Sequence, residues 1–223
     1  MPRMKIFNTL EQATFDTPPV FNSTERKQFF ALPLMLQDAM AGLRTPTNKV
    51  CFLAAVGYFK ARRKFFARNV NSADIDYIAR QLNLNITDVD VSSYTKFACI
   101  HHQRIILDYF GCRPFDAKTM AFAKSEIAML APVQYQPKQI LIEIIQILSR
   151  EKIEVPSYNV LADLIITAIS QHKHTLSNII HHGLNETQRS KLDALLEKEN
   201  DNTTTEGWHY RLTLLKRPSQ STS

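Results

Sequence analysis

Histidine and aspartate are the residue types in this sequence that could hold a metal ion or transfer a proton. Several histidines fall on predicted helices, where ligands four residues apart can share one metal ion. Adjacent histidines, however, point about 100° apart around a helix, and no nearby carboxylate completes a site. We therefore expect no metal site and assign these side chains to polar helix faces or helix caps: His101, His102, His172, His174, His181 and His182.

Four closely spaced aspartates raise the question of two-metal catalysis: Asp74, Asp76, Asp88 and Asp90. Asp74 falls in the first turn of a predicted helix, where the helix dipole favours an anion. Asp88 and Asp90 fall on a predicted short, solvated helix. The sequence has no nucleotide-binding, serine-hydrolase or zinc-protease motif, so we expect no catalysis. A metal-dependent nuclease that uses Asp74 or Asp88 is the weakest of three hypotheses.

Basic and amide side chains predict a different chemistry, which is contact with nucleic acid. The chain has 27 Lys and Arg against 21 Asp and Glu, a net charge of +6 that suits a partner rich in phosphate. Lys and Arg contact phosphates, and Arg and Gln also read base edges. The predicted DNA-binding residues lie on two helices: Lys49, Lys60, Arg63, Lys64 and Arg68 on one, and Lys96, Gln103 and Arg104 on the other.

The first of these helices is expected over residues 45–68. Thr45 is a suitable N-cap, and Pro46 fits the first helical position. At 100° per residue the basic side chains fall on one side of this helix, with Arg63 at the border, and the apolar ones fall on the other. The apolar set is Cys51, Phe52, Ala55, Phe59 and Phe66.

The second helix is expected over residues 94–110 and ends at Gly111, a suitable C′ residue. Its apolar side chains are assigned to the core: Phe97, Ile100, Ile105, Leu107 and Phe110. Between the two helices, Ser72 is expected to cap a compact helix. A turn at residues 83–85 and a short helix at residues 87–93 follow, which together give the outline of a helix-turn-helix.

These elements predict an all-α fold without a sheet, because Gly is scarce at 5 and apolar residues, 44% of the chain, recur mostly at spacings of three and four. We expect an extended or mobile segment at residues 1–22 and two consecutive helical domains at residues 23–111 and 112–196. Residues 197–223 are expected to form a linker and the start of another block. Three cysteines without a C-x-x-C pair are interpreted as reduced core thiols: Cys51, Cys99 and Cys112.

Several stretches, in order along the chain, resemble the amino-terminal region of replicative transposases of the Tn-three family. They are IDYIARQLNLN (75–85), HHQRIILDYFGCRPF (101–115), REKIEVPSYNVLADLI (150–165) and LNETQRSKLDALL (184–196), and the tail YRLTLLKRPSQSTS (210–223) looks like the start of a further block. The sequence departs from the family at Ala98 and Cys99, where the family often has Thr and Arg before the histidine that matches His102. His102 is assigned to packing or phosphate contact.

The resemblance implies sequence-specific binding of double-stranded DNA at the terminal inverted repeats of a transposon. It also implies that the full-length enzyme carries a DDE-type acidic triad and its divalent metal in a domain further downstream. We therefore expect no catalysis and no cofactor in this chain, which would be an expressed fragment or a truncated reading frame. The expected partners are DNA and the remaining transposase domains, in the bacterial cytoplasm at the nucleoid.

A second class of function stays open, a helical protein-interaction or dimerisation module of the same enzyme without DNA contact. Its partner surface would be the apolar segment at residues 140–148, and the partner would be a second copy of the chain. Export and membrane insertion are not expected. The amino terminus lacks the apolar core of a signal peptide, and no window reaches the roughly 18 apolar residues of a membrane-spanning helix.

Overall fold

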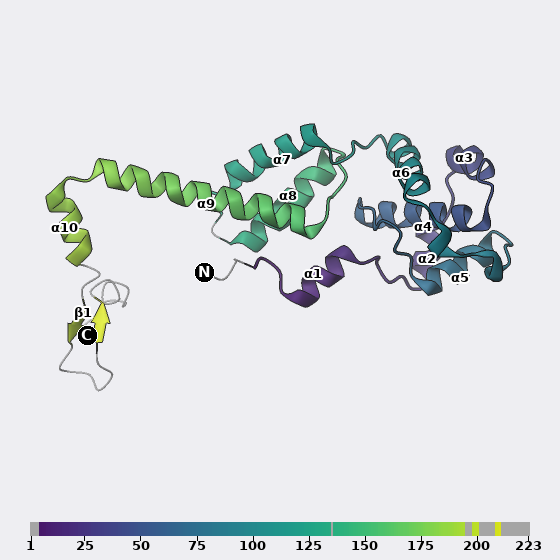
Figure 1. Cartoon of the computed structure of the whole chain (residues 1–223), viewed down its shortest axis with the longest axis horizontal. Coiled ribbons are helices and arrows are strands. Elements are labelled where there is room, and N and C mark those ends of the chain that lie inside the picture. Colours follow the sequence, from purple (N-terminus) through teal and green to yellow (C-terminus); the bar gives the residue numbers. More distant parts are fainter. Residues whose placement is uncertain (1–4, 135, 195–197, 201–207, 211–223) are drawn as a thin grey trace, which may run out of the picture. The chain divides into compact units, whose positions relative to one another are not determined.

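The structure of the protein is a computed structural model that describes residues 5–134, 136–194, 198–200 and 208–210 (Figure 1). The chain divides into two compact units, Met1–Ser170 and Gln171–Ser223. The helices are α1 (Thr9–Asp16), α2 (Ser23–Phe29), α3 (Gln37–Ala41), α4 (Pro46–Arg62), α5 (Ser72–Gln81), α6 (Lys96–Phe110), α7 (Ala117–Leu130), α8 (Pro137–Arg150), α9 (Tyr158–Gly183) and α10 (Glu186–Ala194), with 3₁₀ turns η1 (Leu34–Leu36), η2 (Ile86–Asp88) and η3 (Val91–Ser93).

The prediction of an all-α fold is confirmed by these helices. Strands occur in the described residues only as a hairpin of two short antiparallel segments, β1 (Lys198–Asn200) and β2 (Trp208–Tyr210). The hairpin lies within the predicted linker of residues 197–223, and the rest of that segment lies outside the described residues. In the part of the chain that the structure describes, every helix is too short or too polar to span a bilayer.

Helix α4 is the centre of the first hydrophobic core and packs against α2, α5 and α6. It begins as predicted, with Thr45 Oγ1 accepting a hydrogen bond from Asn48 N (3.2 Å) and Pro46 in the first turn. The prediction of one apolar and one basic side is wrong, because α4 is buried almost all round from Val50 to Phe59. A helix surrounded by other helices must be apolar on every face that they cover.

The end of α4 also differs from the prediction, because the helix stops at Arg62 and does not reach residue 68. Arg63 adopts the left-handed conformation (φ 52°), which ends the helix. Its carbonyl then accepts a hydrogen bond from Val155 N (2.8 Å), a residue far away in the sequence. The basic residues after Arg62 therefore do not continue the face of α4.

Gly57 lets α4 approach Phe30 closely. A Cβ at Gly57 would lie 2.4 Å from Phe30 Cδ1, and the ring, fully buried against Phe21 and Tyr58, has no room to move. We expect Gly57→Ala to lower the free energy of unfolding by about 1–2 kcal/mol in urea denaturation, since overpacking outweighs the gain in helix propensity. Gly42→Ala is the control, because its Cβ would meet atoms no nearer than 3.6 Å. Equal stability of the Gly57 variant and the wild type would contradict this close packing.

A second hydrophobic core lies among α7, α8 and the first part of α9, with Ile6 added from the amino terminus. The apolar side of α8 faces this core, and Ile140, Leu141, Ile144 and Leu148 are fully buried. These four side chains are not available to a partner, whereas Ile142 of the same segment is 38% exposed. A partner surface at residues 140–148 therefore stays a prediction.

The two cores meet within the first unit at the residues that follow α6 and α8. Gly111 ends α6 in the left-handed conformation (φ 59°), as predicted. The chain then reaches Arg113, which pairs with Ile153 in an isolated parallel bridge. Cys112 still belongs to the first core and Phe115 packs against the second, so the change of core falls just after the predicted boundary between residues 111 and 112. Independent domains at 23–111 and 112–196 stay a prediction, since one compact unit contains both cores and ends at Ser170.

The amino-terminal segment contains a helix, α1, where the sequence predicted an extended chain. Asn8 and Glu11 form a reciprocal capping box: Asn8 Oδ1 accepts from Glu11 N (2.8 Å), and Glu11 Oε2 accepts from Asn8 N (3.0 Å). Tertiary contacts hold the segment, since Phe7 N donates to Tyr158 Oη (3.0 Å) and Lys138 Nζ pairs with Glu11 (2.5 Å).

The short helix predicted at residues 87–93 is replaced by two separate 3₁₀ turns, η2 and η3. Asn85 and Asp90 each cap the following turn by accepting a backbone hydrogen bond, and this local bonding competes with a continuous helix. The predicted helix-turn-helix is therefore wrong, because within the described residues no α-helix directly follows the turn at residues 83–85 and α6 begins only at Lys96.

The second unit contains the remainder of α9, followed by α10 and the hairpin. Its described helices carry exposed apolar side chains, among them Leu176, Ile179 and Ile180 on α9. His174, His181 and His182 are exposed and His172 is half-buried, and His182 Nδ1 lies 2.8 Å from the carbonyl of Asn178.

Candidate nucleic-acid interface

Lys64 was predicted to contact phosphate, but its ammonium group lies in the interior of the first unit. Nζ pairs with Asp16 Oδ1 (2.5 Å), donates to the carbonyl of Pro156 (3.2 Å) and lies 3.9 Å from the centre of the Phe15 ring. Burial lowers the pKa of Lys64, and the Asp16 carboxylate opposes that shift. A group engaged in this way is not available to a phosphate, so Lys64 leaves the predicted DNA-binding set.

Lys60 and Arg63 are also engaged within the protein. Lys60 Nζ donates to the carbonyls of Phe29 (3.3 Å) and Ala31 (2.6 Å), where it satisfies groups at the end of α2. Burial lowers the pKa of Lys60. The Arg63 guanidinium lies 5.3 Å from the centre of the Phe110 ring in a cation–π contact. These interactions assign both residues to packing within the first unit.

Helix α6 offers a different surface. Thr95 Oγ1 caps its start by accepting from Ala98 N (3.1 Å). One side of α6 is buried against the first core through Cys99, His102, Ile106 and Leu107. The opposite side, which we call the α6 outer face, carries Lys96, Phe97, Ile100, His101 and Arg104, all exposed.

The outer face combines cations with large apolar groups. Phe97 is 83% exposed and Ile100 is 51% exposed. Within the described ranges, no hydrogen bond or ion pair engages the side chains of Lys96 and Arg104. Phe97, Ile100, His101 and Arg104 follow the spacing i, i+3, i+4 and i+7, so they form one stripe along the helix.

The remaining predicted residues lie at different depths. Arg68 is exposed, and its Nη1 donates to the carbonyl of Tyr94 (3.4 Å), which places the guanidinium beside the start of α6. Gln103 is half-buried and lies against Cys99, with Nε2 3.4 Å from Sγ. Lys49 is half-buried on α4. Of the predicted set, Lys96 and Arg104 are exposed on the α6 outer face, and Arg68 is exposed beside the start of the helix.

His102 fixes how α6 sits on the core. Its ring is buried, with Nδ1 2.8 Å from Tyr94 Oη and the ring centre 5.2 Å from that of Phe52 on α4. Burial lowers the pKa of His102 to about 4, and His101 adds to the shift. Of the two roles left open for His102, the structure assigns packing.

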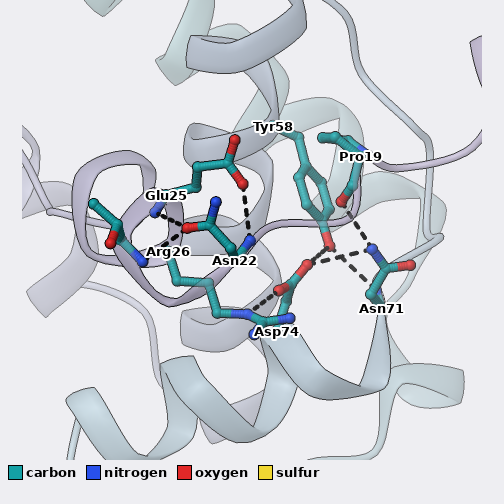
Figure 2. A network of polar contacts seen from close by, with 8 residues as sticks. Pro19, Asn22, Glu25, Arg26, Tyr58, Asn71 and Asp74 are labelled. Atoms are coloured by element: carbon teal, nitrogen blue, oxygen red, sulfur yellow. Dashed lines mark hydrogen bonds and ion pairs between the residues drawn. The ribbon is translucent and has the colours of Figure 1, made fainter.

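Asp74 is the centre of a buried polar network that joins three helices (Figure 2). Its carboxylate accepts from Arg26 Nε of α2 (2.7 Å) and from Tyr58 Oη of α4 (2.8 Å). Asn71 links the network to the chain before α2, since its Nδ2 donates to the carbonyl of Pro19 (3.0 Å). A carboxylate with these partners is structural, which excludes Asp74 as a metal ligand for the nuclease hypothesis.

The other three aspartates, Asp76, Asp88 and Asp90, are not part of the Asp74 network. Asp76 and Asp88 are exposed, and Asp90 accepts from Ser92 N (2.9 Å) as the cap of η3. Among the residues that the structure describes, no three His, Cys, Asp or Glu side chains gather in an arrangement that could hold a metal ion.

Residues 6–168 match a protein family described as a domain of unknown function, DUF4158. The chain belongs to this family. The DUF4158 match runs from the amino-terminal segment into α9, so it includes both cores and the α6 outer face. No curated protein matches the chain.

Sequence reasoning missed two residues of the outer face of this DUF4158 domain. Phe97 and Ile100 were assigned to the core because they are large and apolar. The helical face through Cys99, His102 and Ile106 takes that place, and it turns Phe97 and Ile100 outward. The signal was present in the spacing, since Phe97 and Ile100 share a stripe with Arg104 and not with Ile106.

Proposed function

We propose that this domain binds double-stranded DNA sequence-specifically through the α6 outer face, as the amino-terminal DNA-binding part of a Tn-three family transposase. Its targets would be the terminal inverted repeats of the transposon. The observation that carries the proposal is the presence of unengaged Lys96 and Arg104 on an exposed helix face that also carries large apolar groups. Lys and Arg neutralise phosphates, and an α-helix of this kind fits the major groove.

Family membership and sequence support the same proposal. The DUF4158 domain occurs in Tn-three family transposases. One of the stretches that resembles these enzymes, residues 101–115, begins on the α6 outer face at His101. We assign cleavage and its divalent metal to a separate catalytic domain of the transposase, and we place the protein at the bacterial nucleoid.

The test is a mobility-shift titration with terminal-repeat duplex over a salt series. Lys96→Gln combined with Arg104→Gln removes two cations, so the log–log slope of affinity against salt should become shallower by about 2. Lys118→Gln combined with Lys124→Gln on α7 removes the same charge from exposed positions and is the matched control. A shallower slope in the control alone, or equal affinity for terminal-repeat and scrambled duplex at every salt concentration, would contradict the proposal.

The alternative, a dimerisation module, keeps one supporting observation. The exposed apolar side chains of Leu176, Ile179 and Ile180 offer a surface to a second copy of the chain, whereas most apolar side chains of residues 140–148 are buried or half-buried. Sedimentation equilibrium without DNA separates the two functions: a stable dimer that shifts no duplex favours the alternative.

A further inference from the structure

We infer that the α6 outer face reads thymine, with Phe97 and Ile100 placed against thymine methyl groups in the major groove. This inference rests on the proposed function and names the base that the same site recognises. It assigns a specificity role to the two exposed residues that neither phosphate contact nor core packing explains.

Phe97 is exposed although it is a large apolar residue. A phenylalanine that is 83% exposed in the first turn of a well-packed helix contributes almost nothing to the core. Its neighbours along the stripe are Ile100, one turn later, and then His101 and Arg104. A large apolar group among cations fits a partner that offers phosphates and an apolar group together.

The major groove of DNA offers such a combination of groups. Thymine is the base that presents a methyl group in the major groove of B-DNA, and Phe is among the side chains that contact it. Helix α6 has 15 residues and is therefore about 22 Å long, which is enough to lie along a groove about 12 Å wide. Lys96 and Arg104, on either side of the apolar pair in sequence, can reach phosphates or a guanine edge.

The charges along α6 indicate which end of the helix enters the groove. Asp108 is exposed one turn after Arg104 on the same stripe, and its carboxylate would repel phosphates. The amino-terminal half of α6 therefore enters the groove, and Phe97 lies in that half. Arg68 lies beside the same end of the helix, which adds a cation where the strands would pass.

The orientation of the helix is fixed before binding. The buried His102 and Cys99 hold the opposite side of α6 against the first core, and Thr95 caps its start. Phe97 and Ile100 are thus presented on a rigid element, which is the condition for reading a base by contact.

The experiment replaces thymine by deoxyuridine, which lacks only the methyl group. Duplexes bound by the wild-type chain are first selected from a random-sequence pool and then prepared with thymine or with deoxyuridine. We expect the deoxyuridine duplex to bind about fourfold more weakly for each methyl group contacted, the effect of removing one buried methyl group.

Variants of Phe97 test whether this side chain contacts the thymine methyl group. Phe97→Ala should reduce the affinity for the thymine duplex and should also reduce the difference in affinity between the thymine and deoxyuridine duplexes. Phe97→Leu should keep most of that difference in affinity. Met35→Ala is the matched control, because Met35 is 82% exposed on η1 and outside α6. Folding is not at issue for these variants, since both side chains are exposed, and circular dichroism verifies this.

Four outcomes overturn the inference. Equal affinity of the wild type for the two duplexes refutes thymine recognition, although duplex binding itself stands. So does a difference in affinity between the duplexes that is unchanged in Phe97→Ala. Absence of any duplex binding refutes the proposed function and the inference together. A dimer whose sedimentation changes with Phe97→Ala, without duplex binding, assigns the outer face to a protein partner.

Discussion

Replacing Asp74 by alanine is expected to lower the free energy of unfolding by about 3–5 kcal/mol, the usual cost of removing one partner of a buried ion pair. The change leaves Arg26 without its carboxylate and removes the acceptor of Tyr58 Oη, so three helices lose their common contact. Chemical denaturation followed by circular dichroism measures the effect. A variant with Asp74→Asn should lose less, because the amide oxygen can still accept a hydrogen bond.

Asp76→Ala is the matched control, since Asp76 lies on the same helix but is exposed. Its effect should stay within about 0.5 kcal/mol, as for other surface substitutions. If Asp74→Ala lowered the free energy of unfolding as little as Asp76→Ala, the network would not contribute to stability. Its ion pair would then only offset the cost of burying the charges.

The stability of the protein should also depend on His102 in acid. The folded pKa of His102 is lowered to about 4 by burial, whereas a histidine in the unfolded chain has its ordinary pKa of 6.5. The unfolded chain therefore binds more protons between these two values, and stability is lost as the pH falls through this window. The loss should reach about 3 kcal/mol by pH 4.

His102→Gln isolates this contribution, because glutamine does not titrate and can still bond Tyr94. Carboxylates titrate equally in both proteins, so the comparison is the change in unfolding free energy from pH 7 to pH 4. The wild type should lose about 3 kcal/mol more unfolding free energy than the variant over this range. Parallel pH profiles would show that His102 is protonated at no cost in the folded protein.

Local signals in the sequence predicted where helices begin and end more successfully than which of their side chains are buried. Thr45 and Pro46 correctly mark the start of α4, and Gly111 correctly marks the end of α6, because a cap needs only neighbouring residues. The capping box of Asn8 and Glu11 was equally readable, but the prolines and polar residues around it favoured an extended chain.

The end of α4 could not be predicted, because the turn at Arg63 is stabilised by Val155 from the other core. The burial of Lys64 depends in the same way on Asp16 and Pro156. A helical wheel assumes that the helix continues and that one face meets water, and α4 meets neither condition. The candidate site was predicted in part: Lys96 and Arg104 are exposed as expected, whereas Phe97 and Ile100 were missed.

Asp16 holds a second element in place besides forming its ion pair with Lys64. The same oxygen, Oδ1, also accepts a hydrogen bond from Tyr158 N (3.1 Å) at the first turn of α9. Releasing α1 would therefore uncap α9 and strand a buried ammonium group in one event. The amino-terminal helix should accordingly melt together with the cores in calorimetry, and amide protons at the start of α9 should report on its detachment in hydrogen exchange.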